Sequence, residues 1–366
     1  MPVLAAAVLV VSGGIGRDAA WDAVQPLLAP LAFLLFAVPL AVLLDRLGFF
    51  SSAAALADRG ASPRRGLWML AAAVTTFLNL DASVVLLTPL YIRIARRRGF
   101  DPTTLAYQPA LLACLASSAL PISNLTNLIA ADSAGARAGD FLVHLGPASL
   151  VAVIVGWFAY RGLPADESEP TPVRDSLDAR ALGIGTPVVV FAVVGFTVGD
   201  ALGIKAWIVA LAADLVLLPL VRDLRLADFP FGPVGLAAGL GLLATAAAPH
   251  LGLDRLFAGS STAAALRVAG LAMLGADTIN NLPALLVGLP ALGGNHALLW
   301  PLLFGVNAGP VFVLHGSLAG LLWRDTAARL DVEVTAWQYT RTGLRVGTPA
   351  VAAGLAIVLA TGALGL

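Results

Sequence analysis

Charged residues are scarce in this chain. Asp, Glu, Lys and Arg make up 12% of its 366 residues, whereas an average soluble domain carries about 25%. A larger soluble core does not explain the deficit, because a surface that faces water needs polar and charged side chains. Lipid as the outer solvent removes that need, and 59% of the residues are hydrophobic, with a mean hydropathy of +0.89. The composition therefore predicts an all-α integral membrane protein.

Other absences exclude several classes of function. The only cysteine is Cys114, so the chain cannot form an intramolecular disulfide or a cysteine-cluster metal site. A formal net charge of zero gives no reason to expect a nucleic acid partner. No glutamate lies inside any predicted span and no His-Glu-x-x-His pair is present, which disfavours a membrane-embedded enzyme. We predict no metal site and no cofactor. Without a nucleotide-binding loop, ATP-driven transport would require an ATPase partner subunit.

Long apolar runs dominate what is present. A helix that crosses a bilayer needs roughly 17–25 mostly apolar residues. Seven stretches are predicted spans: 2–16, 27–44, 141–160, 182–199, 204–221, 232–249 and 345–364. Two more are long but interrupted by polar residues: 103–130 and 297–323. The stretches 66–95 and 263–292 have polar centres, and each arm is expected to be too short to cross, which predicts re-entrant hairpins. Because residues 1–11 have no basic segment, they indicate a first span rather than a signal peptide.

Basic residues divide unequally between the two sides of this arrangement. With nine crossings and two hairpins, one side receives five of the 22 Lys and Arg residues: Arg17, Arg137, Lys205, Arg255 and Arg267. The other seventeen fall on the side of the 45–66 loop. Cytoplasmic loops carry the excess of Lys and Arg, so the N-terminus is expected in the cytoplasm and the C-terminus outside. The predicted location is the plasma or inner membrane.

The two halves of the chain share an order of parts. We predict a first half over 1–160, a cytoplasmic linker over 161–180 and a second half over 181–366. Each half has plain spans, an amphipathic connector (about 45–62 and 250–262), a hairpin, an interrupted span and a final span. The hairpins open to opposite faces, which is typical of an inverted repeat with a binding site at broken helices near the midplane. The first half has two spans before its hairpin and the second half has three.

Four polar clusters lie at matching places in the two halves, two in the hairpins and two in the interrupted spans. Asn and Ser in hydrocarbon cost several kcal/mol if they lack partners, and interhelical packing is a weak explanation for four matched clusters. Unwound backbone and half-helix ends attract ions and polar oxygens. The predicted solute-binding residues are Asn79, Asp81, Ser83, Ser123, Asn124, Thr126, Asn127, Asn280, Asn281, Asn307 and Ser317.

Ionisable residues inside the membrane are the candidates for proton or ion coupling. Asp81 and Asp277 lie at the hairpin tips and can bind a cation or relay a proton. Asp214, in the apolar run 208–220, is either a proton carrier or a structural acid paired with a neighbouring helix. His315 lies beside the second break and can titrate near neutral pH, although a hydrogen-bonded core histidine is the simpler interpretation. Cys114 lies among small residues and is expected to serve packing.

These clusters resemble motifs of the arsenite/antimonite efflux permeases. Residues 79–89, Asn-Leu-Asp-Ala-Ser-Val-Val-Leu-Leu-Thr-Pro, resemble the family hairpin A-N-D-G-A-x-x-x-L-T-P. Residues 121–132 resemble P-x-x-x-S-N-L-x-N-I-x-x-A-D, and residues 280–283, Asn-Asn-Leu-Pro, resemble N-N-M-P. Residues 307–310 and 316–323 resemble N-x-G-P followed by G-S-L-A-x-x-L-W. The four motifs stand in the family order between about 66 and 325.

The resemblance implies the ion transporter superfamily, which also contains divalent-anion/sodium symporters and sodium/proton antiporters. It further implies that the hairpin tips and broken helices form the transport site. Proteins of this architecture often form homodimers, and the sequence leaves the oligomeric state of this chain open. The chain departs from the pattern at Leu80, where the family has Asn, and at His315, where an apolar residue is expected. The chain and the loop between its halves are also short for an arsenite permease.

Two hypotheses for transport follow. The first is proton-coupled efflux of arsenite or antimonite, in which As(OH)3 binds through its hydroxyl groups and Asp81 carries the coupling proton. The alternative is a sodium/proton antiporter or an anion transporter for dicarboxylate or sulfate. The symporters place Ser-Asn-Thr at both hairpin tips, and neither tip has it here. In either case the expected partners are a small inorganic solute, protons or sodium, and the lipid bilayer.

Overall fold

The computed structural model describes the whole chain except residues 1, 14–15, 59–61, 164–176, 200–201 and 364–366. In the described part every regular element is a helix, and no strand is formed. The first half contains α1 (Pro2–Val11), α2 (Arg17–Val24), α3 (Leu28–Arg46), α4 (Phe49–Asp58), α5 (Pro63–Phe77), α6 (Leu80–Arg98), α7 (Pro102–Leu115), α8 (Leu125–Ala134), α9 (Ala138–His144) and α10 (Gly146–Tyr160). The second half contains α11 (Ala179–Val198), α12 (Ala206–Val221), α13 (Phe231–Ala247), α14 (Thr262–Ile279), α15 (Asn281–Ala291), α16 (His296–Ala308), α17 (Leu318–Ala328) and α18 (Ala336–Ala363).

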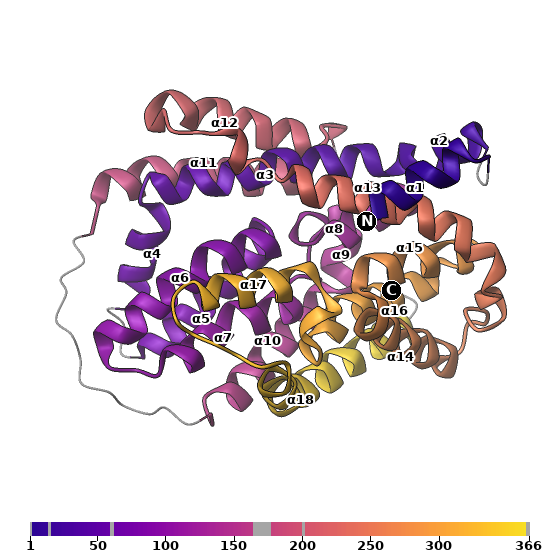
Figure 1. Ribbon diagram of the computed structural model, residues 1–366. Helices are drawn as coiled ribbons and strands as arrows, with labels where there is room; N and C mark the ends of the chain where they lie inside the picture. The colour runs from indigo at the N-terminus through magenta and orange to yellow at the C-terminus, as the bar shows by residue number, and fades with distance from the viewer. Residues whose placement is uncertain (1, 14–15, 59–61, 164–176, 200–201, 364–366) are drawn as a thin grey trace.

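The helices form a layer and a larger body. The helices α3, α11, α12 and α13 run side by side across the top of the view in Figure 1, and α1 packs on α13. The remaining long helices form the body beneath this layer, with α5–α7 and α17 on one side and α14–α16 on the other (Figure 1). The last helices of the two halves, α10 and α18, pack against each other along their length.

Each half contains two interrupted pairs of helices inside this body. In the first pair, α5 and α6 are separated by Leu78 and Asn79, and α14 and α15 by Asn280 alone. In the second pair, the interruption is longer and holds 3-10 turns: Pro121–Ser123 between α7 and α8, and Gly309–Val311 and Leu314–Gly316 between α16 and α17. We refer to residues 116–124 as the first break and to residues 309–317 as the second break.

Small residues bring α14 and α16 into close contact. A Cβ atom at Gly305 of α16 would lie 2.5 Å from the carbonyl oxygen of Ala269 and 2.7 Å from the Ala272 side chain, both on α14. Those distances leave no room for a larger residue, so the backbones touch here in the way that small residues permit between membrane helices. This contact holds the second break against the hairpin arm that precedes Asn280.

Most of the predicted segments are helical in the structure. Four helices are long and apolar enough to cross a bilayer on their own: Ala20–Arg46, Ala179–Val198, Thr262–Ile279 and Ala336–Gly362. The pair α9 and α10, bent by 51°, would make a fifth. The predicted spans at 204–221 and 232–249 correspond to the shorter apolar helices α12 and α13. Most of the predicted linker 161–180 lies outside the described residues, and the division into halves stays a prediction.

One detail of the sequence prediction is wrong. One hairpin arm is longer than expected, because α14 has 18 residues and passes the length and hydropathy test for a span. An α-helix rises about 1.5 Å per residue, so α14 is roughly 27 Å long. The two predicted connectors have different secondary structure: the first contains helix α4, and the second contains short 3-10 turns at Ala248–His250 and Leu253–Arg255.

Candidate solute-binding site

Four helices begin at polar residues that cap their own N-termini. Asn79 accepts a hydrogen bond from the backbone N–H of Asp81 at 2.8 Å, and Asn124 accepts one from the N–H of Thr126 at 3.2 Å. In the second half, Asn280 accepts from the N–H of Leu282 at 3.3 Å, and Ser317 accepts from the N–H of Gly320 at 3.1 Å. Asn and Ser are preferred caps because their side-chain oxygens satisfy N–H groups that have no partner within the helix.

The two hairpin tips are tied to the two breaks in the same way. The amide Nδ2 of Asn79 donates to the carbonyl oxygen of Ile122 at 3.4 Å. The amide Nδ2 of Asn280 donates to the carbonyl oxygen of His315 at 3.0 Å. Ile122 lies two residues before the cap Asn124, and His315 lies two residues before the cap Ser317. Each tip therefore uses its asparagine both to start a helix and to hold the neighbouring break.

A cavity of about 210 Å³ lies where these N-termini meet. The predicted site residues that line it are Asp81, Asn124, Thr126, Asn280, Asn281 and Ser317. Its remaining wall comes from the helical layer, through Leu34 of α3 and through Pro233, Leu236, Ala237 and Leu240 of α13. The cavity thus lies between the body and the layer, with its polar groups on the side of the body.

The electrostatics of this cavity combine several partial positive charges with one carboxylate. A helix N-terminus carries roughly +0.5 elementary charge and attracts anions or polar oxygens. The first-turn residues of α6, α8, α15 and α17 all line the cavity, so four such ends face it. Asp81 supplies the only acidic side chain in the lining. Neither the Asp81 carboxylate nor the Asn281 amide has a side-chain partner among the described residues, so both can bind a solute.

Asn307 lies behind the cavity and links the two broken helices. Its Oδ1 accepts hydrogen bonds from Asn124 Nδ2 at 2.9 Å and from the Thr126 hydroxyl at 2.7 Å. Its Nδ2 donates to Asn127 Oδ1 at 2.6 Å and to the Ser118 hydroxyl at 3.4 Å. All four bonding positions of this amide are thereby occupied. Asn307 therefore orients the cavity residues Asn124 and Thr126.

Other predicted site residues hold the first break in shape. The Ser123 hydroxyl donates to the carbonyl oxygens of Ser117 and Leu120 at 2.8 and 2.6 Å. The Asn127 amide donates to the same two carbonyls, at 2.8 and 2.9 Å. Ser83 joins the arms of the first hairpin, because its hydroxyl accepts from Thr75 at 2.9 Å. These side chains are buried, and the cavity lining does not include Ser83, Ser123 or Asn127.

Asp277 lies against the second break rather than in the cavity lining. One of its carboxylate oxygens, Oδ1, is buried and has no hydrogen-bond partner among the described residues. A Cβ atom at Gly316 would lie 3.2 Å from that oxygen, which places the carboxylate directly against the break. Nearby, the Tyr339 hydroxyl donates to the carbonyl oxygen of Pro310 at 3.2 Å.

The remaining two candidates lie apart from the cavity. Asp214 is buried on α12, which packs on α3, and its Oδ1 has no partner among the described residues. Of the two interpretations of Asp214, the structural acid paired with a neighbouring helix finds no partner for Oδ1 among the described residues. His315 contributes its backbone carbonyl to the second break, while the residue as a whole is exposed. The interpretation of His315 as a buried core histidine is wrong.

Sequence reasoning missed the α13 wall of the cavity. Residues 233, 236, 237 and 240 follow the spacing of one helical face, and the structure turns that face toward the hairpin tips. The same spacing on an apolar helix is expected when a face packs on lipid or on another helix. No signal in the residue types distinguishes those environments from a cavity wall.

A comparison with protein families decides the broader identity. The family model described as a citrate transporter, CitMHS, matches residues 1–328. This chain belongs to the CitMHS citrate transporter family. It is accordingly a membrane transporter of the ion transporter superfamily, as the sequence motifs predicted.

This chain is also similar to individual relatives along most of its length. It is 27% identical to the arsenical pump membrane protein of Escherichia coli K12 over 355 residues, which covers 87% of this chain and 82% of that protein. The arsenical pump membrane protein of Yersinia enterocolitica is 28% identical with the same coverage. The magnetosome protein MamN of Magnetospirillum gryphiswaldense is 26% identical over 93% of this chain and 89% of its own.

Proposed function

We propose that this chain is a secondary active transporter that moves a small, oxygen-rich solute through the cavity between the two hairpin tips. The observation that supports this proposal most is the meeting of four capped helix N-termini around one cavity, in which Asp81 and Asn281 have no side-chain partner among the described residues. A purely structural cluster would satisfy its polar groups internally, as Asn307 and Ser123 do.

Arsenite or antimonite is the leading solute. At neutral pH arsenite is As(OH)3, whose three hydroxyl groups can donate to the Asp81 carboxylate and accept from the Asn281 amide and the helix N-termini. An ionised Asp81 disfavours a solute that carries two negative charges. The relatives from Escherichia coli and Yersinia enterocolitica are named as arsenical pump membrane proteins, which supports arsenite or antimonite as the solute.

The coupling proton is assigned to Asp81. Because this carboxylate lines the cavity, a proton on Asp81 removes the acceptor that a hydroxyl group of the solute would use. Proton and solute then compete for one site, which is the requirement for exchanging one against the other. Efflux of the solute would be driven by entry of the proton.

The proposed topology is an inverted repeat with nine crossings and two hairpins in the inner membrane. The matching ties of Asn79 to Ile122 and of Asn280 to His315 support an internal repeat. The unequal distribution of arginine supports a cytoplasmic N-terminus and an external C-terminus.

Sodium/proton exchange is the second candidate, and Asp277 favours it. A buried carboxylate oxygen with no donor among the described residues, set against the backbone of the second break, offers the kind of oxygen ligand that a hard cation prefers. An anion transporter is the third possibility, since the family model is described as a citrate transporter.

A transport screen distinguishes these functions. The full chain is purified without any ATPase subunit and reconstituted into vesicles, and uptake of arsenite, citrate and sulfate is measured under a pH gradient or a sodium gradient. The proposal predicts arsenite movement driven by the pH gradient. Transport of citrate or sulfate without arsenite, or sodium/proton exchange with no solute, would replace it by the corresponding alternative.

A further inference from the structure

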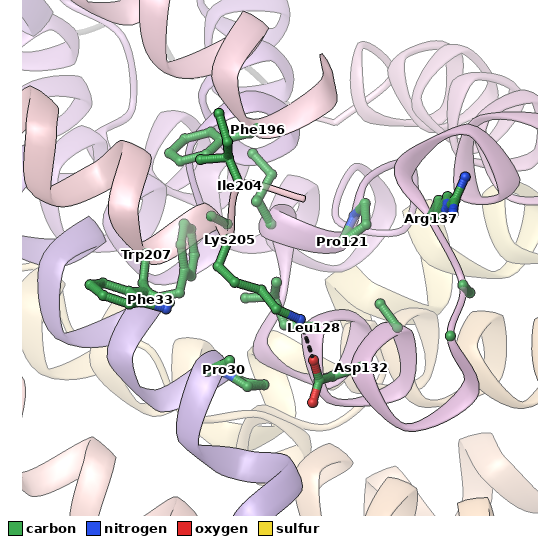
Figure 2. A pocket seen from close by; sticks show the side chains of 16 residues that line it. Pro30, Phe33, Pro121, Leu128, Asp132, Arg137, Phe196, Ile204, Lys205 and Trp207 are labelled. Carbon is green, nitrogen blue, oxygen red and sulfur yellow. Dashed lines mark hydrogen bonds and ion pairs between the residues drawn. The ribbon is translucent and has the colours of Figure 1, made fainter. Parts of the chain in front are cut away.

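A second cavity lies on the other side of the first break. It has a volume of about 200 Å³, and Figure 2 shows the side chains that line it. Pro121 and Ile122 of the break line this cavity, whereas Asn124 and Thr126 line the cavity between the hairpin tips. The first break is thus the partition between the two spaces. Side-chain hydrogen bonds from Ser123 and from Asn127 of α8 hold the break in shape, and Asn79 donates to its Ile122 carbonyl.

One wall of the second cavity is built from packed aromatic residues of the helical layer. Phe33 of α3 meets Phe196 of α11 edge to face, with ring centroids 5.5 Å apart. Trp207 of α12 lies 6.3 Å from Phe36 of α3. These contacts join α3, α11 and α12 on that side of the cavity. The facing wall is helix α8, through Leu128, Ala131 and Asp132.

An ion pair joins the two walls. Lys205, at the start of α12, reaches across to Asp132 near the end of α8, and Nζ lies 3.1 Å from Oδ1 (Figure 2). The two side chains are 58% and 31% exposed, so water reaches the pair. Helix α8 has 10 residues and is therefore about 15 Å long. Its N-terminus carries Asn124 and Thr126, so the pair restrains the same short helix that presents those two residues to the solute.

We propose that the cavity in Figure 2 is a vestibule for the solute and that Asp132 and Lys205 form its gate. The inference rests on the proposed function and adds the route by which the solute reaches or leaves the site. While the pair is closed, α8 stays against the layer and the first break separates the two cavities. When the pair opens, α8 moves away from α12 and the partition moves with it. The vestibule accepts the same class of solute, small and rich in hydroxyl groups, in a lining whose charged side chains among the described residues are Asp132, Arg137 and Lys205.

Charge reversal tests the gate without requiring any solute. A reporter cysteine, Leu128→Cys, is placed on the vestibule wall in a Cys114→Ala chain, and its rate of reaction with a membrane-impermeant maleimide is measured. An exposed ion pair contributes about 0.2–1 kcal/mol, so Lys205→Asp or Asp132→Lys is expected to speed labelling by about 1.4- to fivefold. The double reversal restores an ion pair and is expected to return the rate to that of the Lys205–Asp132 background.

A matched cysteine on the same helix controls for general loosening. Ser133 is exposed and lines a different pocket, beside His296, so labelling of Ser133→Cys is expected to be unchanged by the charge reversals. The gate would be overturned if Leu128→Cys is labelled at the same rate with the unchanged ion pair, with either single reversal and with the double reversal. Faster labelling of both cysteines, or no recovery in the double reversal, would also overturn it, because the pair would then act on the fold rather than on the vestibule.

Solute protection tests the vestibule. Excess arsenite is expected to slow labelling of Leu128→Cys and to leave Ser133→Cys unaffected. If the reconstituted chain carries arsenite and Leu128→Cys is not protected, the vestibule is wrong and the proposed function stands. If the chain carries no arsenite, the proposed solute is wrong, and the charge-reversal rates still decide whether the gate exists.

Discussion

The first and second breaks have the same place in their halves and differ in their hydrogen bonding. In the first break, side chains donate to buried backbone carbonyls: Thr76 to Ala116 at 2.9 Å, and Ser123 and Asn127 to Ser117 and Leu120. In the second break, Tyr339 and Asn280 donate to carbonyls, but the residue that corresponds to Ser123 is Gly316, and a carboxylate oxygen of Asp277 lies beside it with no donor among the described residues. Similar backbones therefore carry different chemistry.

The difference teaches which break can respond to an ion. Carbonyls that already accept hydrogen bonds gain little from a nearby proton or cation. We therefore expect the first break to act as a rigid partition between the two cavities. A carboxylate oxygen without a donor is costly to bury, and a proton or a cation on Asp277 would relieve that cost. We expect the solute site to depend on the first break for its geometry, and the second break to be the place where an ion other than the coupling proton on Asp81 acts.

Removing the ionisable group at the second break is expected to have the largest effect. Asp277→Asn offers an N–H donor where the carboxylate has none, so the unfolding midpoint in detergent is expected to stay level or rise by about 2 °C. Under the sodium/proton alternative, in which Asp277 binds the cation, transport driven by a sodium gradient is expected to fall about tenfold or more. At the corresponding place in the first half, Thr76→Val removes a donor, so the midpoint is expected to fall while ion dependence persists. A lower midpoint for Asp277→Asn with unchanged ion dependence would make Asp277 a structural acid.

The link between the broken helices is expected to rank second. Asn307→Ala leaves Asn124, Thr126 and Asn127 each without one partner, and an unsatisfied buried polar group costs about 1–3 kcal/mol. Chemical denaturation should show that loss together with weaker solute binding. Cys114 is the matched control, because it is the second-last residue of α7 as Asn307 is of α16. Cys114→Ala is expected to cost less than about 1 kcal/mol and to leave binding intact. Equal losses of stability and of solute binding in Asn307→Ala and Cys114→Ala would show that Asn307 has no special role in linking the broken helices.

Exchanging the residues that distinguish the breaks is expected to give a smaller effect. Ser123→Ala removes a hydroxyl donor and is expected to cost about 1 kcal/mol. Gly316→Ser adds a hydroxyl beside Asp277, but a Cβ there lies 3.0 Å from Pro310 Cα, so the chain must shift slightly to hold it. If the added hydroxyl donates to Asp277, ion dependence of transport weakens while the unfolding midpoint changes little. Unchanged ion dependence in a folded Gly316→Ser chain would contradict the proposed balance.

The smallest contrast is expected at the hairpin tips. Asn79 has an extended backbone, with φ of −176°, whereas Asn280 has φ of 85°. Glycine at an N-cap costs only a few tenths of a kcal/mol, and it relieves a positive φ. Asn280→Gly is therefore expected to be nearly neutral, and Asn79→Gly to cost about 1 kcal/mol through loss of the bond to Ile122. Paired denaturation curves check this, and a larger cost at Asn280 would show that its bond to His315 matters more than its backbone strain.

The sequence predicted the helical architecture and the polar clusters well, because apolar length and intramembrane Asn, Asp and Ser are strong signals in a chain with so little charge. It could not separate residues that face the solute from residues that orient them. Asn124 and Asn307 look alike in sequence. Asn124 lines the cavity, whereas Asn307 lies behind it and uses both its amide oxygen and its amide nitrogen in hydrogen bonds to other side chains. That distinction depends on which way each side chain turns at a break, and no periodicity describes irregular backbone.

Tertiary packing hid other features as well. The pairing of Asp132 with Lys205 joins α8 to α12, and neither residue lies in a polar cluster. The exposure of His315 depends on the turn at Leu314–Gly316. That Asp214 Oδ1 has no hydrogen-bond partner among the described residues is visible only once α12 and α3 are packed.

Arsenite accumulation by vesicles that contain the Asp81→Asn chain tests the central claim most directly. The account predicts that a pH gradient no longer drives accumulation, while exchange of arsenite between the two sides at equal pH continues, because Asn281 and the four helix N-termini still bind the solute. Accumulation by Asp81→Asn at the wild-type level would contradict the assignment of the coupling proton to the cavity.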